Sequence, residues 1–149
     1  MAVSAVNPNL NTPTLDTRRF DMVDGELILR DSAAAALSTS AAETGIAFDA
    51  EKVCYYKAVI QHSAISGTVD GSNYWTVTVE ASDNNSDWVE VRSFQLGAAA
   101  ERYDVALEGA EIEALMDTAG EGEAIWLRVN ATETGTTAGD LDYTAFLTC

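Results

Sequence analysis

Hydrophobic and polar residues alternate along much of this chain with a period of two, the pattern of β-strands that bury one face. Residues 74–81 show it most clearly, because a tryptophan, two valines and an alanine alternate there with polar side chains. The same alternation marks residues 53–63, 88–94, 103–107, 125–131 and 141–147, and a short apolar run at 27–29 follows the turn signal Asp24-Gly25. The chain therefore predicts a series of short strands.

The apolar face of each predicted strand identifies the side chains of the core. Ile125, Leu127, Val129 and Ala131 share one face of a predicted strand. In another strand, Val89, Val91 and Ser93 lie on the face opposite Trp88, Glu90, Arg92 and Phe94. Since such faces must be covered, the central part of the core is expected between two sheets. Its predicted members are Trp75, Val77, Val79, Leu127, Val129 and Tyr143.

Polar segments between the strands predict the connections. Residues 83–86, Asp-Asn-Asn-Ser, are typical of a hairpin turn, because short polar side chains bond to their own backbone and tolerate left-handed dihedrals. Residues 132–140 are expected to form a long polar hairpin loop. The single helical candidate is 109–116, where Ile112, Leu115 and Met116 recur at intervals of three and four.

Many short strands and a single short helix predict an all-β fold, an antiparallel two-sheet β-sandwich over residues 26–149. A jelly-roll-like order of eight strands is favoured, and an immunoglobulin-like order is the alternative. Residues 1–25 contain Pro8 and Pro13 among Asn and Thr and have no hydrophobic period. We expect this segment to be an extended N-terminal arm.

The charge of the chain restricts its partners. It carries 8 Lys and Arg against 24 Asp and Glu, a net charge of −16. Nucleic-acid affinity rests on neutralising phosphates with basic residues, so nucleic acid and anionic membranes are poor partners. The apolar runs are too short to span a bilayer, and the N-terminus lacks the basic and apolar regions of a secretory signal. Cys54 and Cys149 are expected to be free thiols in a protein matured in reducing cytoplasm.

His62 is the only histidine, so any Ser-His-Asp arrangement must contain it. Ser63 and Ser66 lie close by in sequence, but no Gly-x-Ser-x-Gly turn surrounds either of them. A polar histidine at a strand end is the favoured interpretation. Glu121 and Glu123 form a pair of carboxylates such as glycosidases use. Acidic residues are so abundant in this chain that such pairs arise by chance, so the pair carries no weight.

Metal and cofactor signals are weak. Asp83, Asn85 and Asp87 have the spacing of the first half of a calcium loop, but the glycine and the bidentate glutamate of that loop are missing, which favours a structural turn. Asp140 and Asp142, near Glu133, have no better support as a cation site. The loop 132–140 has no lysine and is acidic, so it is not a phosphate-binding loop. We expect no catalytic, cofactor-binding or metal-binding residues, and a protein that is not an enzyme.

The aromatic residues leave one alternative open. Trp75, Trp88, Trp126 and Tyr74 form either an exposed platform for a sugar or part of the packing between the sheets, and the alternation favours packing. A carbohydrate-binding or adhesion module of a phage tail or cell surface is therefore the alternative function.

Four stretches carry a resemblance to a known class of protein. They are residues 43–49 (ETGIAFD), 74–82 followed by Asp87-Trp88-Val89, 126–132 (WLRVNAT) and 143–147 (YTAFL). This combination resembles the head decoration, or cement, proteins of tailed phages. The resemblance implies a virion protein, made in the host cytoplasm, that binds the major capsid protein on the capsid exterior. It also implies a homo-oligomer, with a trimer favoured.

The distribution of charge predicts where a partner docks. Residues 1–30 hold three basic and four acidic residues, a net of −1, so the rest of the chain carries −15. Like-charged bodies repel, so contact is expected where the field is weakest. We predict that Arg18, Arg19 and Phe20 touch the capsid surface or a sister subunit, with Phe20 as an apolar anchor and the arginines on carboxylates.

Overall fold

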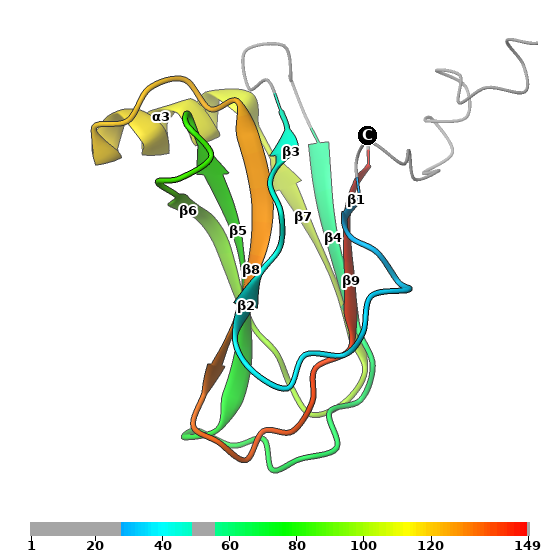
Figure 1. The fold of residues 1–149 in the computed structure, drawn as a ribbon. Helices are drawn as coiled ribbons and strands as arrows, with labels where there is room; N and C mark the ends of the chain where they lie inside the picture. The colour runs from blue at the N-terminus through cyan, green and yellow to red at the C-terminus, as the bar shows by residue number, and fades with distance from the viewer. Residues whose placement is uncertain (1–27, 49–55, 149) are drawn as a thin grey trace, which may run out of the picture.

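The computed structural model describes residues 28–48 and 56–148, which form two antiparallel sheets packed face to face (Figure 1). The first sheet has the order β1 (Ile28–Arg30), β9 (Tyr143–Thr148), β4 (Tyr56–His62) and β7 (Glu101–Leu107). The second has the order β2 (Ala41–Ala42), β8 (Trp126–Thr134), β5 (Tyr74–Ser82) and β6 (Val89–Gln95), and β3 (Ile46–Ala47) also pairs with β8. The predicted two-sheet sandwich is confirmed.

The strand order is that of a jelly roll. β2 and β3 pair with different parts of β8, so together they act as one interrupted strand. β1 then pairs with β9, the β2–β3 strand pairs with β8, β4 pairs with β7, and β5 pairs with β6 in a hairpin. This is a long antiparallel ribbon rolled into two sheets. The immunoglobulin-like alternative is wrong, since among the described strands only β5 and β6 are consecutive and paired.

The predicted central core is confirmed. β5 and β8 are paired over their full nine residues, and their inward side chains meet those of the first sheet. At most 2% of the surface of each predicted core residue is exposed; these residues are Trp75, Val77, Val79, Leu127, Val129 and Tyr143. Strand β4 adds Ala58 and Ile60 from the opposite sheet. The alternation was informative here because both sheets bury one face on each other.

A bulge changes the predicted face of β6. The alternation placed Ser93 on the face of Val91 and Phe94 on the opposite face, but Val91 is buried, Ser93 is exposed and Phe94 packs against the core. The register shifts between Val79 and Glu80, so one extra residue of β6 is accommodated beside β5. A β-bulge of this kind moves every later side chain of the strand to the other face.

Ile125 also departs from its predicted position, because 43% of its surface is exposed. Strand β8 begins one residue later, at Trp126. Ile125 lies in the connection that leads from the helix, where its N–H donates to the Ser82 carbonyl and its own carbonyl accepts from Phe48. Its side chain is therefore outside the regular pleat that places Leu127 inward.

The segment after β8 is not the hairpin loop that its polar composition predicted. β8 belongs to the second sheet and β9 to the first, so residues 135–142 cross from one sheet to the other. Gly135 and Gly139 have left-handed φ values of 77° and 85°, which bend the chain at the start and near the middle of the crossing. The Trp75 indole N–H donates to the Gly139 carbonyl at 2.8 Å, and Ala138 is buried. The segment thus closes one end of the sandwich.

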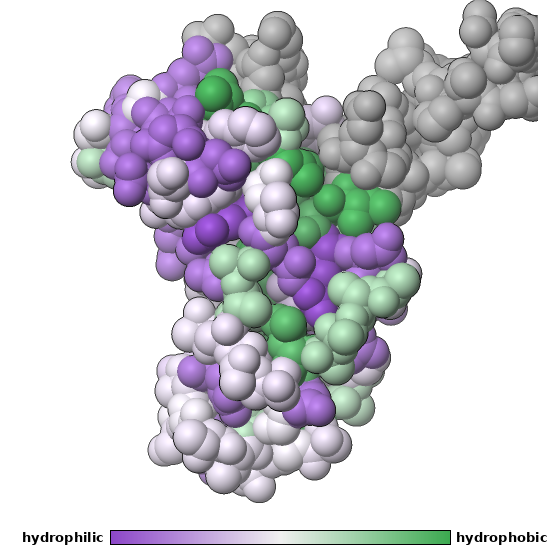
Figure 2. Space-filling model, in the orientation of Figure 1, coloured by the Kyte–Doolittle hydropathy of each residue, from purple (hydrophilic) through white to green (hydrophobic). Residues whose placement is uncertain are grey.

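Helix α3 (Gly109–Ala119) covers the other end of the sandwich, beside β6 (Figure 1). It continues three residues beyond the predicted 109–116 and ends at Gly120, whose φ of 80° allows the left-handed cap. Ile112 and Met116 are buried, as their spacing predicted. The rest of the helix is acidic, and Figure 2 shows this end of the molecule as its most hydrophilic region.

A buried arginine joins the two sheets where β1 and β3 come together. Arg30 is 4% exposed; its Nε donates to the Tyr143 carbonyl of the first sheet at 3.1 Å, and its Nη2 donates to the Ala35 carbonyl at 2.5 Å. Its Nη1 forms an ion pair with Glu43, which lies between β2 and β3 of the second sheet. The guanidinium also stacks over the Tyr143 ring, 4.6 Å from its centroid.

Glu43→Leu is expected to lower the free energy of unfolding by about 3 kcal/mol, because it leaves the Arg30 charge buried without its carboxylate. Arg30→Met together with Glu43→Leu should recover most of this loss, since no unpaired charge then remains. Urea denaturation of the three proteins measures both effects. A Glu43→Leu protein as stable as the wild type would show that the pair does not hold the sheets together.

Candidate functional site

His62, the last residue of β4, is buried in the core face of the first sheet. Its Nδ1 donates to the Ser63 carbonyl at 2.8 Å, and its ring stacks on Tyr103 with centroids 6.2 Å apart and planes 12° apart. The other nitrogen, Nε2, is buried without a hydrogen-bond partner among the described residues. The imidazole therefore packs as an aromatic ring at the end of a strand.

Ser63 and Asp142 come together beside this histidine. The Ser63 hydroxyl donates to Asp142 Oδ2 at 3.3 Å, and the Ser63 N–H donates to the Asp142 carbonyl at 3.0 Å. In a Ser-His-acid relay the serine hydroxyl is hydrogen-bonded to one imidazole nitrogen, and the carboxylate is hydrogen-bonded to the other. Here the Ser63 hydroxyl is hydrogen-bonded to Asp142, and His62 Nδ1 is hydrogen-bonded to the Ser63 carbonyl. These three residues therefore do not form that relay.

The Asp-Asn-Asn-Ser segment forms the predicted turn between β5 and β6. The Asn84 side-chain oxygen accepts from the N–H groups of Ser86 and Asp87, both at 2.8 Å, and Asn85 has a left-handed φ of 60°. Asp83 Oδ2 points elsewhere and accepts from the Gly122 N–H at 2.9 Å. The Asp87 carboxylate accepts instead from the Asn84 side-chain amide at 2.9 Å, so the two carboxylates have separate partners, as expected for a structural turn.

No group of three or more His, Cys, Asp or Glu side chains able to hold a metal occurs within residues 28–48 and 56–148. Asp142 is bonded to Ser63, and the Glu133 backbone N–H bonds to Ser40. The predicted docking residues Arg18, Arg19 and Phe20 lie outside the described residues, as do both cysteines. Their roles stay predictions.

The tryptophans are divided between the core and the outer face of the second sheet. Trp75 is fully buried, whereas Trp88 and Trp126 are half-buried. Arg128 covers the Trp88 ring at 4.1 Å from its centroid. Gly45 lies so close to the same ring that a Cβ there would come within 2.7 Å of it. Trp75 and Trp88 therefore take no part in a common flat platform, and the packing interpretation is confirmed for Trp75.

The Tyr143 hydroxyl, like His62 Nε2 and Asp83 Oδ1, is buried without a hydrogen-bond partner among the described residues. Burial raises the pKa of this phenol far above its ordinary value; the negative charge of Glu43 raises it further, while Arg30 opposes the shift. The side chain thus stays neutral in the folded protein well into the alkaline range.

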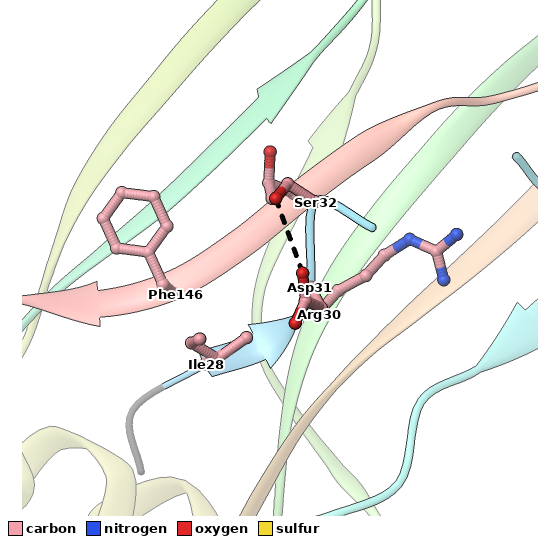
Figure 3. A pocket seen from close by; sticks show the side chains of 6 residues that line it. Ile28, Arg30, Asp31, Ser32 and Phe146 are labelled. Atoms are coloured by element: carbon pink, nitrogen blue, oxygen red, sulfur yellow. Dashed lines mark hydrogen bonds between the residues drawn. The ribbon is translucent and has the colours of Figure 1, made fainter. Parts of the chain in front are cut away.

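An apolar hollow lies on the outer surface of the first sheet, between β1 and β9. It has a volume of about 320 Å³ and is lined by Ile28, Arg30, Asp31, Ser32, Thr144 and Phe146. Figure 3 shows Ile28 and Phe146 side by side from the two strands, while the Arg30 side chain points away from them. Asp31 and Ser32 form the polar rim, where Asp31 Oδ1 accepts from the Ala33 N–H at 2.8 Å.

The same β1 strand borders a second groove, of about 390 Å³, on the side of β3. Ile28 and Leu29 line it from β1, and Ile46 lines it from β3. Figure 2 shows hydrophobic residues gathered where these strands meet. Sequence reasoning missed both depressions; the only signal was Phe146, which alternates with the core residues 143, 145 and 147 and so had to face outward.

No model of a known protein family and no curated protein matches this chain. The fold is therefore identified as an antiparallel jelly-roll sandwich from its own strand order. Among the helices of the described residues, none is long and apolar enough to cross a membrane.

The stability of the protein is expected to fall as the pH rises above about 10, the ordinary pKa of tyrosine. The unfolded chain then loses the Tyr143 proton while the folded chain retains it, so alkali favours unfolding. Tyr143→Phe removes this contribution and should flatten the decline of the urea midpoint between about pH 9 and 11.5. Tyr103, whose pKa is also raised by burial and by Glu101, contributes in the same direction. Tyr103→Phe is therefore the matched comparison, and equal slopes for wild type and Tyr143→Phe would contradict the expectation.

Proposed function

We propose that this protein is a non-enzymatic structural protein of a phage virion, a decoration or cement protein that binds the outer surface of the assembled capsid and stabilises it. The observation that carries the proposal is the combination of a jelly-roll sandwich with a nearly neutral preceding segment, in a chain of net charge −16. The resemblance of residues 43–49, 74–82, 87–89, 126–132 and 143–147 to such proteins supports it. On this proposal the partner is the major capsid protein.

Selective binding to the assembled shell supplies the stabilisation. A ligand that binds only one state stabilises it by RT ln(1 + [L]/Kd), or about 2.7 kcal/mol per site at a hundredfold excess over Kd. Many sites on one shell add their contributions. A shell held in this way resists the outward pressure of packaged nucleic acid.

The proposal is tested with shells assembled from the major capsid protein encoded in the same genome. Purified protein should bind these shells at saturable sites, raise their disruption temperature and appear as added density on their exterior in electron cryomicroscopy. Soluble capsid subunits serve as the control and should bind far more weakly, because the binding surface is formed by the lattice. A protein that leaves shells unoccupied at saturating concentration, or that binds a glycan instead, would favour the adhesion alternative.

The N-terminal arm is proposed to contribute Arg18, Arg19 and Phe20 to this contact. Arg18→Ala together with Arg19→Ala should lower occupancy on shells, and more at low salt than at high salt, because exposed charge pairs are screened. Thr12→Ala with Thr14→Ala is the matched control within the same segment. Deletion of residues 1–24 should weaken shell binding and leave the thermal midpoint nearly unchanged. Unchanged occupancy of the arginine variant at both salt concentrations would remove the arginines from the interface.

A further inference from the structure

We infer that strand β7 is a contact between two copies of this chain, in which the two β7 strands pair antiparallel about a two-fold axis at Tyr103. β7 is an edge strand of the first sheet, because it pairs with β4 on one side and with no other described strand on the other. An unpaired edge presents a row of backbone N–H and C=O groups to which a strand of another chain can bond. The inference goes beyond the proposed function and does not depend on it.

The other sheet edges of the described structure are short, irregular or covered. β1 has three residues, and β2 and β3 have two residues each. β6 contains the bulge opposite Val79 and Glu80, and its Arg92 forms an ion pair with Glu111 of helix α3. Bulges and covering elements keep an edge strand from pairing with other chains. β7 has seven residues in unbroken register with β4, so it is the longest regular edge among the described strands.

Two-fold symmetry restricts the register of such a pair. The axis is perpendicular to the joined sheet, so the outward sides of the two copies remain on the same side of it. Residues directly opposite one another on neighbouring strands also point to the same side, while side chains along each strand alternate. The axis must therefore pass at a residue of β7 and not between two residues.

Charge selects Tyr103 as the residue at the axis. Arg102 and Asp104 are exposed and lie on the outward side of β7, since Tyr103 between them packs against the core. With Tyr103 at the axis, Arg102 of each copy is opposite Asp104 of the other, which makes two favourable cross-strand pairs. With Arg102 or Asp104 at the axis, that residue would be opposite its own like charge. With Val105 at the axis, Asp104 would be opposite Ala106, and the charge of the carboxylate would have no cross-strand partner.

The contacts within each copy are compatible with these pairs. Arg102 Nε donates to Asp104 Oδ1 at 2.7 Å, Lys57 Nζ lies 3.9 Å from Asp104 Oδ2, and Arg102 has a further interaction in its own chain. None of these contacts has to break, because a guanidinium has five N–H donors and a carboxylate accepts several hydrogen bonds. In the paired strands the four charges alternate in sign around the axis, so each has two neighbours of opposite sign.

The inward side of the same edge is apolar and incompletely covered. Tyr103 and Val105 are half-buried, and the Tyr103 ring packs on Phe94 of β6 with centroids 5.5 Å apart. These side chains lie where the edges of the two sheets meet. A strand added to β7 covers more of their apolar surface, and this burial favours association.

Antiparallel pairing also separates the most acidic parts of the two copies. Helix α3 follows β7 closely in the chain and carries Glu111, Glu113 and Asp117 but no basic residue (Figure 1). Strands that run in opposite directions place the two helices at opposite ends of the pair, whereas parallel strands would place them side by side. Two chains of net charge −16 therefore meet with less repulsion in the antiparallel arrangement.

Two charge reversals in the full chain test this register. Arg102→Asp places carboxylates opposite one another across the axis, and Asp104→Arg places guanidinium groups opposite one another. Because symmetry repeats each contact, either variant alone is expected to self-associate roughly tenfold more weakly than the wild type. An equimolar mixture of the two variants should associate to within about threefold of the wild type, since every reversed residue then faces the opposite charge. Sedimentation equilibrium measures the four affinities, and a folding defect cannot produce the recovery.

Glu90→Arg is the matched control. Glu90 is exposed on β6, the edge strand of the other sheet, and its reversal changes the net charge as much as Asp104→Arg does. Glu90→Arg should leave self-association within about twofold of the wild type, because distant exposed charges are screened. Mixed with Arg102→Asp, it should restore nothing.

The outcomes are independent of shell binding, so the inference and the proposed function can fail separately. A wild type that stays monomeric at about 1 mM would overturn the inference. A trimer, the state implied by the resemblance, would also overturn it, because two-fold pairing of β7 closes at two copies. A dimer that both single reversals leave intact, or that the mixture of variants does not recover, would show that the copies meet elsewhere.

Discussion

One buried guanidinium fixes the geometry at the edge where the two sheets meet. Arg30 bonds to a carbonyl of the first sheet through Tyr143 and to a carboxylate of the second through Glu43. A buried cation without such partners costs several kcal/mol, so the positions of β1, the turn that follows and the β2–β3 segment are coupled through it. The same contacts also fix the position of Ile28, which lies two residues before Arg30 in β1 and lines the outer hollow.

The jelly-roll order places the hollow between segments that are distant in sequence. β1 pairs with β9, and Arg30 and Tyr143, which lie 113 residues apart, are in contact there. Such non-local pairings form slowly and are completed only when the last strand is present. The outward surface of the first sheet depends on them, since β9 lies between β1 and β4. A single sheet thus brings the hollow and the outward side chains of β4 and β9 onto one side.

The sequence predicted the class of fold and the central core, because alternation records which side chains of a strand point inward. The alternation depends only on the residues of one strand. It does not predict the bulge of β6 opposite Val79 and Glu80, which depends on the pairing with β5. Nor does it predict the crossing at residues 135–142, which depends on the sheet to which each strand belongs. The Arg30–Glu43 pair and the hollow at Phe146 were missed for the same reason: each is formed by residues from different strands. The predicted arm residues lie outside the described part of the chain.

The acidic residues of this protein are distributed unevenly over its described surface. At physiological salt the field of an exposed charge is screened beyond about 8 Å, so the charges next to a contact matter more than the net charge. A chain of −16 with acidic residues spread evenly would be repelled on every side. Here acidic residues gather around α3, whereas on the outward side of the first sheet Lys57 and Arg102 stand beside Asp104. The repulsion of other acidic molecules is therefore strongest at the end that α3 covers.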